Sequence, residues 1–490
     1  MATSFTLKLG KMKTSRSFNH WQLRTLIITM VGYALFYFVR KNFSVAMPGL
    51  TAEFGISKVS LGLFLTLHGI IYGLSRFVNG IIADRGSARI VASVGLLLCA
   101  VANILFGCSD TVAHWIVALA AKMGTTMAFS TVLIYFMGIV WVINGYLQGM
   151  GIPPFTKIMT HWIHPDQLAT KMSIWNMSHS IGAGLVFGLC GWFIMPHLGL
   201  DMSADADVVA NIAANMGAGA SADEVLSFAQ HFGAWRLCFI IPAIFALVGA
   251  VGIFFLVKNS PSEVGFAEVV EQKQKTEQSV SQKAEYNAFV RRKVFGNRLI
   301  WTLGVANFFV YIVRFAALDW GPTLLTESKG LSLAMATTLC IVFEFIGGNI
   351  GMVVAGWLTD HLFGNRAHRT CVFCMAGVAL SVALFWIIPQ GTAWWVLMVP
   401  FTLMGFFVYG PQALLGISAA NQATNRAAAT ANGILGIFGY ASTLISGVGF
   451  GYVAQYYGWN GAYLTIFIMA LLGMVALLTM WGAPANGYED

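Results

Sequence analysis

The sequence is poor in charge. Only 10% of its 490 residues are charged, whereas 57% are hydrophobic and the mean hydropathy is +0.72. Soluble domains carry roughly 25% charged residues, so this scarcity excludes a water-soluble globular fold. The seven cysteines all fall within or beside apolar stretches, which argues against a disulfide framework, and the Cys371-x-x-Cys374 pair lacks the βαβ context of a redox motif.

Motifs of nucleotide and cofactor chemistry are missing as well. The chain contains no GxxxxGK[ST] loop and no Rossmann glycine pattern, which disfavours an ATP-driven pump and a redox enzyme. No catalytic constellation and no metal-ligand spacing stands out, so we predict a protein that is not an enzyme and uses no cofactor. A polar, basic tail precedes a first apolar run that is too long for a cleavable signal peptide.

What the sequence has in abundance is apolar segments of about twenty residues, the length that crosses a bilayer as an α-helix. Polar breaks separate about twelve of them, which predicts an all-α polytopic membrane protein with twelve transmembrane helices. The expected spans are residues 23–48, 60–83, 88–108, 124–150, 169–196, 234–257, 299–322, 331–359, 370–389, 393–416, 427–453 and 460–482.

The cations outside these spans are unevenly distributed. Only four fall on one side, Lys58, Lys122, Arg236 and Lys329, and the rest fall on the other side together with both termini. The positive-inside rule then places both termini in the cytoplasm. This topology accounts for the formal net charge of +8, so we expect a lipid bilayer and no nucleic acid as partner.

One long charged stretch divides the chain into halves. We expect a cytoplasmic tail at 1–22, a six-helix bundle at 23–257, a cytoplasmic linker at 258–298, a second six-helix bundle at 299–482 and a tail at 483–490. A repeat supports this division, because Tyr37-Phe-Val-Arg40 matches Tyr311-Ile-Val-Arg314 about 275 residues later. Gly80-x-x-x-Asp84 matches Gly356-x-x-x-Asp360 at a similar offset, which predicts two pseudo-symmetric bundles.

Several motifs resemble a known family. Gly80-x-x-x-Asp84-Arg85-Gly86-x-x-Arg89 is similar to the cytoplasmic loop signature of the major facilitator superfamily, and Gly356, Asp360 and Arg366 stand where its second copy belongs. More specific motifs are GYALFYFVRKN (32–42), YGLSRF (72–77), QGMGIPP (148–154), WNMSHSIG (175–182), YIVRFAALDW (311–320), YGPQ (409–412) and GIFGY (436–440). From about residue 21 to about residue 482, the chain resembles the organophosphate:phosphate antiporter family of glycerol-3-phosphate and hexose-phosphate transporters. The resemblance implies the major facilitator fold, a monomer, and a place in the inner membrane of a bacterial cell.

Four cations lie inside apolar spans: Arg40, Lys41, Arg76 and Arg314. Each costs about 2.5 to 3.5 kcal/mol at a helix centre unless it faces water or a partner. The only acids at similar depth are Asp319 and Glu344, so the excess of positive charge suits an anion. A phosphomonoester is mostly a dianion at pH 7, and the arginine fork binds its oxygens in pairs. Arg40 and Arg314 hold equivalent places in the repeat, which predicts opposite walls of one central site.

The resemblance implies roles for individual residues. Arg40 and Arg314 would hold the phosphate and His179 would contact it, in a cavity lined by Tyr33, Tyr37, Tyr72, Tyr311, Tyr440, Trp175 and Asn176. Lys41 and Arg76 would either join the site or form gating ion pairs with Asp319 and Glu344, and gating by Lys41 with Asp319 is favoured. Asp84, Arg85, Arg89, Asp360 and Arg366 would latch helix ends while the halves rock. The alternatives are structural: arginines paired with acids or helix ends, a histidine bonded to a neighbouring helix, and aromatics of the membrane interface.

The expected activity is exchange of an organophosphate, with glycerol 3-phosphate favoured, for inorganic phosphate by alternating access. Hexose-phosphate transporters are expected to carry an Asp and a Lys in the eleventh helix, and residues 427–453 contain neither. A hexose-phosphate transporter, or a membrane sensor of hexose phosphate that signals to a kinase, are the alternatives. A proton-coupled drug exporter is disfavoured, because its cationic substrates require an acidic cavity.

Two stretches depart from the family pattern, around Ala113 to Ser130 and from Asp201 to His231. Both are expected on the periplasmic side, away from the central cavity. The Ala, Gly and Asp content of the second predicts a flexible loop, whose removal should leave transport nearly intact.

Overall fold

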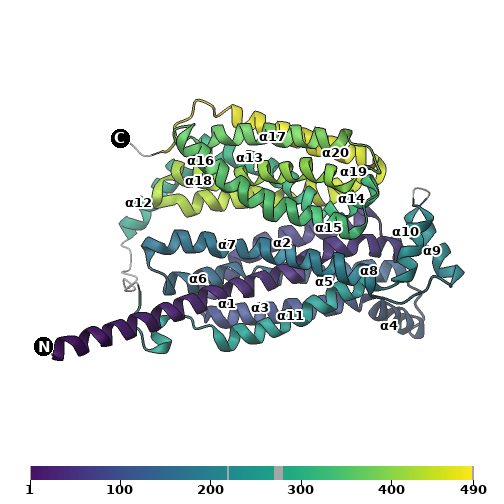
Figure 1. Ribbon diagram of the computed structural model, residues 1–490, viewed down its shortest axis with the longest axis horizontal. Coiled ribbons are helices and arrows are strands. Elements are labelled where there is room, and N and C mark those ends of the chain that lie inside the picture. Colours follow the sequence, from purple (N-terminus) through teal and green to yellow (C-terminus); the bar gives the residue numbers. More distant parts are fainter. Residues whose placement is uncertain (1, 218–219, 270–279, 488–490) are drawn as a thin grey trace.

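The computed structural model describes residues 2–217, 220–269 and 280–487, and these residues are predominantly helical (Figure 1). Within them no β-strand forms, and one isolated antiparallel bridge joins Leu200 to Phe232. Twelve helices in these residues are long and apolar enough to cross a membrane. The predicted all-α polytopic architecture is therefore confirmed.

The described residues of the first half form eleven α-helices and one π-helical segment. Their bounds are α1 (Ala2–Phe54), α2 (Lys58–Arg85), α3 (Ala88–Gly107), α4 (Ser109–Lys122), α5 (Phe129–Gln148), α6 (Ile152–Trp162), α7 (Pro165–Gly188), η1 (Leu189–Ile194), α8 (Met195–His197), α9 (Ala206–Met216), α10 (Ala222–Gln230) and α11 (Ala234–Leu256).

A linker follows, in which the described residues form η2 (Pro261–Val264), α12 (Val280–Val290) and η3 (Arg291–Phe295). The second half contains α13 (Arg298–Asp319), α14 (Gly321–Lys329), α15 (Leu333–Ile341), η4 (Val342–Gly348), α16 (Asn349–His361), α17 (Ala367–Ile387), α18 (Trp394–Ala441), η5 (Leu444–Gly449), α19 (Phe450–Tyr456) and α20 (Gly458–Leu478).

The helices differ from the expected spans at three places. Helix α1 begins at Ala2, so the expected N-terminal tail continues the first span as helix. The fourth span begins at Phe129 rather than at residue 124, because Ser109–Lys122 forms the separate helix α4. Helix α18 contains the tenth span and the first part of the eleventh, on either side of the non-helical residue Thr424 (φ 62°, ψ 168°), and η5 and α19 complete the eleventh.

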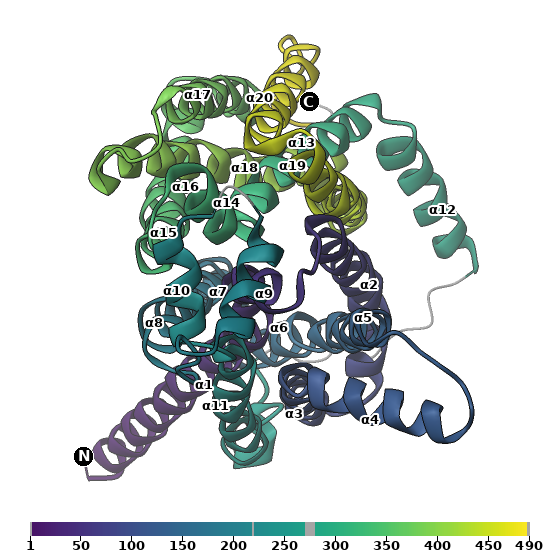
Figure 2. The same ribbon diagram turned by 90° about the vertical axis from the view of Figure 1, so that its right-hand side faces the viewer.

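The helices form two bundles, α1–α11 and α13–α20, joined by the linker (Figure 1). Both ends of the described chain and the linker lie at one end of the molecule, which we call the terminal end. Helices α4, α9 and α10 lie at the opposite end, the far end, which faces the viewer in Figure 2.

The outer surface is apolar, as a bilayer requires. On α11, Ile244, Val248 and Phe255 are exposed, whereas Ala243 and Ala250 on the other face are buried. The hydrophobic effect does not drive helices together in lipid. Small residues at the contacts instead let the helix backbones approach closely, and the resulting van der Waals packing stabilises the bundle. The exposed face is therefore the lipid-facing one.

The contacts that join the two bundles, in the part of the chain that is described, gather at the far end and at mid-height. At the far end Lys58 pairs with Glu327 at 2.9 Å. Nearby, the Thr66 hydroxyl donates to the Thr443 carbonyl at 2.7 Å, and the backbone N–H of Val448 donates to Thr66 Oγ1 at 2.9 Å. The far ends of α2 and η5 are thus sealed together.

The insert from Asp201 to His231 is not the flexible loop predicted from its composition. Its described residues form α9 and α10, which we call the far-end cap. Ile212, Val225 and Ala229 form a small core against Ala52 of α1. The Ser221 and Glu224 side chains form a capping box at the start of α10. The apolar residues at helical spacing therefore determine the structure of this insert, and the small and acidic residues around them do not prevent helix formation.

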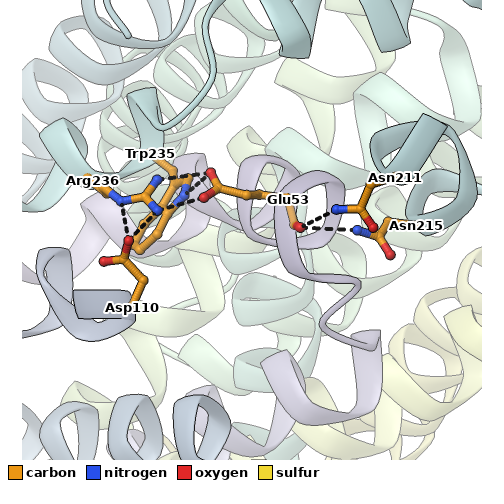
Figure 3. A network of polar contacts seen from close by, with 6 residues as sticks. All are labelled: Glu53, Asp110, Asn211, Asn215, Trp235 and Arg236. Atoms are coloured by element: carbon orange, nitrogen blue, oxygen red, sulfur yellow. Dashed lines mark hydrogen bonds and ion pairs between the residues drawn. The ribbon is translucent and has the colours of Figure 1, made fainter. Parts of the chain in front are cut away.

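The far-end cap also provides hydrogen-bond donors for the last carbonyls of α1. Gly55 takes the left-handed conformation (φ 63°) that ends the helix, which leaves its last carbonyls without partners inside the helix. Asn215 of α9 donates to the carbonyls of Ala52 and Glu53, both at 3.1 Å, and Asn211 donates to that of Glu53 at 3.4 Å (Figure 3). The cap and α1 thus behave as one unit.

Replacing Asn215 by alanine should lower the free energy of unfolding by about 1 to 3 kcal/mol, the penalty for partly buried carbonyls that lose their donor. Thermal unfolding of the purified protein in detergent measures this effect. Asp223→Ala, an exposed change on α10, is the control and should leave the midpoint almost unchanged. Equal midpoints for the two variants would mean that the cap does not support α1.

Candidate functional site

Helix α1 is broken at Val39 (φ −96°, ψ 22°), immediately before the first predicted arginine. The break frees the Val39 carbonyl, which accepts from Asn103 of α3 and Asn144 of α5, each at 3.0 Å. Gln148 of α5 donates to the neighbouring Phe36 carbonyl at 3.0 Å. These buried amides provide the hydrogen bonds that the helix has lost, so side chains of the neighbouring helices stabilise the break.

Sequence reasoning did not single out these amides, although an amide in an apolar span was a usable signal. Buried polar groups are costly without partners, so Asn103, Asn144 and Gln148 had to bond something inside the bundle. Asn42 joins them by donating to Asn103 Oδ1 and to the Cys238 carbonyl, both at 2.9 Å. The network holds the segment of α1 that carries Arg40 and Lys41.

Arg40 lies among tyrosines. Its guanidinium carbon is 4.2 Å from the ring centre of Tyr72 and 5.4 Å from that of Tyr37. Arg76 donates to the Tyr440 hydroxyl across the halves at 2.8 Å, and the rings of Tyr72 and Tyr440 are 5.2 Å apart. In this structure Arg76 is thus bonded to Tyr440 and forms no ion pair with Glu344 or Asp319, and its role in gating stays a prediction.

Arg314 lies on α13 and is the cation that faces Glu344. Its Nη2 is 3.7 Å from Glu344 Oε1, and its guanidinium carbon lies 5.0 Å from the ring centre of Tyr409 and 5.8 Å from that of Tyr311. Arg314 Nε and both Glu344 oxygens are buried without a hydrogen-bond partner in the described chain. The pair is loose, and Arg314 keeps donors that an anion can use.

His179 lies on α7 beside the tyrosines of α1. Its Nδ1 bonds the Asn176 carbonyl, its Nε2 is 3.3 Å from Ser180 Oγ, and its ring is 5.6 Å from that of Tyr37. Arg314, Arg40 and Lys41 are all within electrostatic reach of it. The structure therefore brings the predicted histidine close to the cations of both halves.

Of the expected cavity residues, Trp175 is buried and its neighbour Asn176 is exposed. Trp175 is buried, stacks on Tyr33 at 4.8 Å and donates to Thr29 Oγ1 at 3.2 Å, so it packs α7 against α1. The Asn176 side chain is exposed, and only its carbonyl takes part in the contact with His179.

The predicted contact between Lys41 and Asp319 is present as an ion pair between α1 and α13. It lines a cavity of about 30 Å³ together with Arg40, Tyr440 and His68. His68 was not predicted, and its Nε2 is buried without a partner in the part of the chain described here. A cavity of this size holds one or two water molecules. The cavity can admit a larger ligand only if the two halves part at this level.

The expected latch residues lie at the terminal end. Arg89 stays within its own half, where Nη1 donates to the Val257 carbonyl at 3.5 Å. Asp84, Arg85 and Asp360 are exposed and Arg366 is half-exposed, and none of these four side chains makes a hydrogen bond or ion pair with another described residue. Their role as a latch stays a prediction.

The family described as Major Facilitator Superfamily matches residues 29–446. The "Glycerol-3-phosphate transporter" of Bacillus subtilis (strain 168) is 31% identical over 479 residues, covering 97% of this chain and 95% of that protein. The "Membrane sensor protein UhpC" of Escherichia coli (strain K12) is 31% identical over 484 residues, covering 97% and 96%. The "Probable hexose phosphate transport protein" of Chlamydia trachomatis is 29% identical over 483 residues, covering 96% and 92%.

Solved structures share the fold at lower identity. The inward open xylose transporter XylE from E. coli matches with a TM-score of 0.65 at 16% identity, covering 94% of this chain and 96% of that one. A bacterial homologue of the human lysosomal transporter Spinster, inward-facing and unoccupied, matches with a TM-score of 0.65 at 15% identity, covering 94% and 97%. At these identities the likeness concerns the fold alone.

Proposed function

The chain belongs to the major facilitator superfamily, in its organophosphate:phosphate antiporter family, and we propose that it exchanges glycerol 3-phosphate for inorganic phosphate. The observation that carries this proposal is the loose Arg314–Glu344 pair at 3.7 Å, whose buried donor Arg314 Nε has no partner in the described chain. A phosphate oxygen would provide that partner. Arg40, held by the amides around Val39, would bind the same dianion from the other half.

The aromatic surroundings support an anionic ligand as well. Tyr37 is within electrostatic reach of both Arg40 and Arg314, and the Tyr72 and Tyr440 rings flank Arg40 and Arg76. Tyrosine hydroxyls donate hydrogen bonds to phosphate oxygens, and their rings stabilise the arginines while the site is empty of ligand.

The arrangement of the halves suits one state of an alternating-access cycle. The positive-inside rule places the terminal end in the cytoplasm. The far-end contacts, such as Lys58 with Glu327, would then close the periplasmic side. Exchange would require these contacts to break and the terminal ends to come together, where Asp84, Arg85, Arg89, Asp360 and Arg366 would latch the helices.

The direct test is exchange in proteoliposomes. Purified protein is reconstituted into vesicles loaded with phosphate, and the uptake of radiolabelled phosphate is competed with phosphate esters. We expect saturable uptake that requires internal phosphate, with glycerol 3-phosphate a stronger competitor than glucose 6-phosphate. Stronger competition by the hexose phosphate would assign the substrate to the alternative class, and no uptake in correctly inserted protein would contradict the proposal.

A sensor is the second candidate, because one of the similar proteins is a membrane sensor. A sensor binds its ligand without sustained flux. Ligand binding in detergent combined with the absence of exchange in vesicles would therefore favour this function over transport.

Replacing Gly447 by valine should abolish most of the exchange, because this glycine permits the far-end seal. A Cβ at residue 447 would lie 2.3 Å from Thr66 Oγ1 and 2.7 Å from the Gly62 carbonyl oxygen. The halves could then no longer close at this end, and exchange should fall at least about tenfold if closure costs 1.4 kcal/mol or more.

Gly433→Val is the matched control, since a Cβ there meets nothing within 4 Å. Both variants are assayed by phosphate exchange, normalised to the protein inserted. Exchange by Gly447→Val at the rate of Gly433→Val would show that close packing of η5 against α2 is dispensable for the cycle.

A further inference from the structure

A large cavity at the far end lies outside the central site. It has a volume of about 510 Å³ and is bounded by the end of α1, α4, the start of α5, α9 and the start of α11. Its polar wall is the network of Figure 3, in which Arg236 lies between Glu53 and Asp110. A cavity of this volume is in the range of sites for small organic molecules.

Arg236 directs four of its five N–H donors at two carboxylates, which leaves little for an anion. Its Nη1 and Nη2 donate to the two oxygens of Glu53 at 2.9 and 2.6 Å, and its Nε and Nη2 donate to Asp110 Oδ2 at 3.2 and 2.6 Å. Glu53 in addition accepts from Trp235 Nε1 at 2.8 Å. This cavity is therefore not a second phosphate site, although it contains an arginine.

The carboxylates outnumber the cation in this wall. Asp110 Oδ1 is buried and has no hydrogen-bond partner among the described residues. Burial alone would raise the pKa of Asp110, but the hydrogen bonds and charge of Arg236, with the first-turn amides of α4, hold that pKa below its usual range. The wall thus holds two carboxylates against one guanidinium, and its net charge is negative.

Aromatic rings form part of the remaining walls. His114 stacks on Phe129 with ring centres 4.3 Å apart, and Phe54 lies 6.3 Å from Phe129. A carboxylate beside aromatic faces favours an organic cation. A bare metal ion is disfavoured, because no cluster of three or more His, Cys, Asp or Glu side chains forms in residues 2–217, 220–269 and 280–487.

The exposed residues of α4 indicate that this cavity lies at the level of the membrane surface. Trp115, Leu119 and Met123 follow one another at helical spacing, and all three are largely exposed. An exposed apolar stripe on a short helix at the end of a membrane bundle is typical of a helix that lies in the interface. Ammonium headgroups of lipids lie at the same level.

We propose that the cavity between α4 and the far-end cap binds an organic ammonium group, with Asp110 as its counter-ion and His114, Phe129 and Phe54 as its aromatic walls. The ammonium group comes from a lipid headgroup or from a free solute of the same chemistry. Binding at this place bridges α4, α1 and α9, so a bound cation would stabilise the far end of the first bundle. This site is independent of the proposed exchange of phosphate.

The test measures binding rather than transport. Ethanolamine and choline are titrated calorimetrically into the purified full-length protein, with ethylene glycol as a neutral probe of similar size. In a second arm, nanodiscs of phosphatidylethanolamine and of phosphatidylglycerol are compared by native mass spectrometry for retained lipid. Asp110→Asn removes the charge of the proposed counter-ion, and Asp207→Asn, which changes an exposed acid on α9, is the matched control.

We expect saturable binding of the ammonium compounds, or selective retention of phosphatidylethanolamine, that weakens about 10- to 100-fold in Asp110→Asn and is unchanged in Asp207→Asn. Binding in the soluble arm assigns a free solute, and retention in the lipid arm alone assigns a headgroup. If Asp110→Asn does not fold, His114→Ala, which leaves the Arg236 ion pairs in place, should weaken binding instead. Binding of ethylene glycol as strong as that of ethanolamine, equal binding by both Asp variants, or no binding in either arm would overturn the proposal.

Discussion

Arg40→Lys and Arg314→Lys should each reduce phosphate exchange by about 100-fold. Lysine keeps the positive charge but offers a single ammonium, which cannot bind two phosphate oxygens with the planar geometry of a guanidinium. The loss of one charge-assisted hydrogen bond accounts for roughly 1.5 to 3 kcal/mol, and 2.7 kcal/mol corresponds to about 100-fold. The Nε of Arg314 is buried without a partner in the described chain, and lysine has no donor to replace it.

The measurement is counterflow of radiolabelled phosphate in proteoliposomes at equal amounts of inserted protein. Arg298→Lys is the matched control, since Arg298 is exposed at the start of the same helix as Arg314. The control should exchange phosphate like the unmodified protein. A purified Arg314→Lys variant that binds and exchanges phosphate as well as Arg298→Lys would rule out the two-arginine site.

Lys41→Ala and Asp319→Ala should each reduce exchange severely, and the double variant should recover part of the loss. The two side chains form an ion pair between the halves and are only slightly exposed. Removing one partner leaves an uncompensated charge at a cost of about 3 kcal/mol, whereas removing both eliminates that penalty. The double variant should therefore exchange phosphate faster than either single variant.

The double-mutant cycle needs exchange rates for all four proteins, normalised to the amount inserted. A coupling energy of about 1 kcal/mol or more supports a gating pair. Strictly additive losses would mean that the contact has no energetic role in the cycle, and Lys41 would then belong to the ligand site together with Arg40.

The spans and the cations of the central site could be predicted because both depend on local features. A run of about twenty apolar residues is legible without knowledge of its neighbours, and Arg314 stands out as a charge inside such a run. The repeat adds that Arg40 holds the equivalent place. None of this requires knowledge of which side chains meet across the bundle.

The partners of these residues could not be predicted, because they are distant in the sequence. Arg76 bonds Tyr440, which is 364 residues away, and no local pattern distinguishes this hydroxyl from the carboxylate of Glu344. The break at Val39 is likewise invisible in a segment that contains neither proline nor glycine next to it. For the far-end cap, the frequent Ala, Gly and Asp residues masked the spacing of Val208 and Ile212 along one helix face.

The break in α1 also has a consequence for how the protein is made. The ribosome synthesises Val39 before the side-chain amides that donate to its carbonyl, because Asn103 and Asn144 follow 64 and 105 residues later in the chain. At a synthesis rate of roughly 5 to 20 residues per second, the nascent α1 waits about 5 to 20 seconds for the last of these donors. During this time it carries a free carbonyl and the charges of Arg40 and Lys41, which lipid does not tolerate at mid-depth. The first helix therefore has to remain at the translocon, or in contact with water, until α5 has emerged.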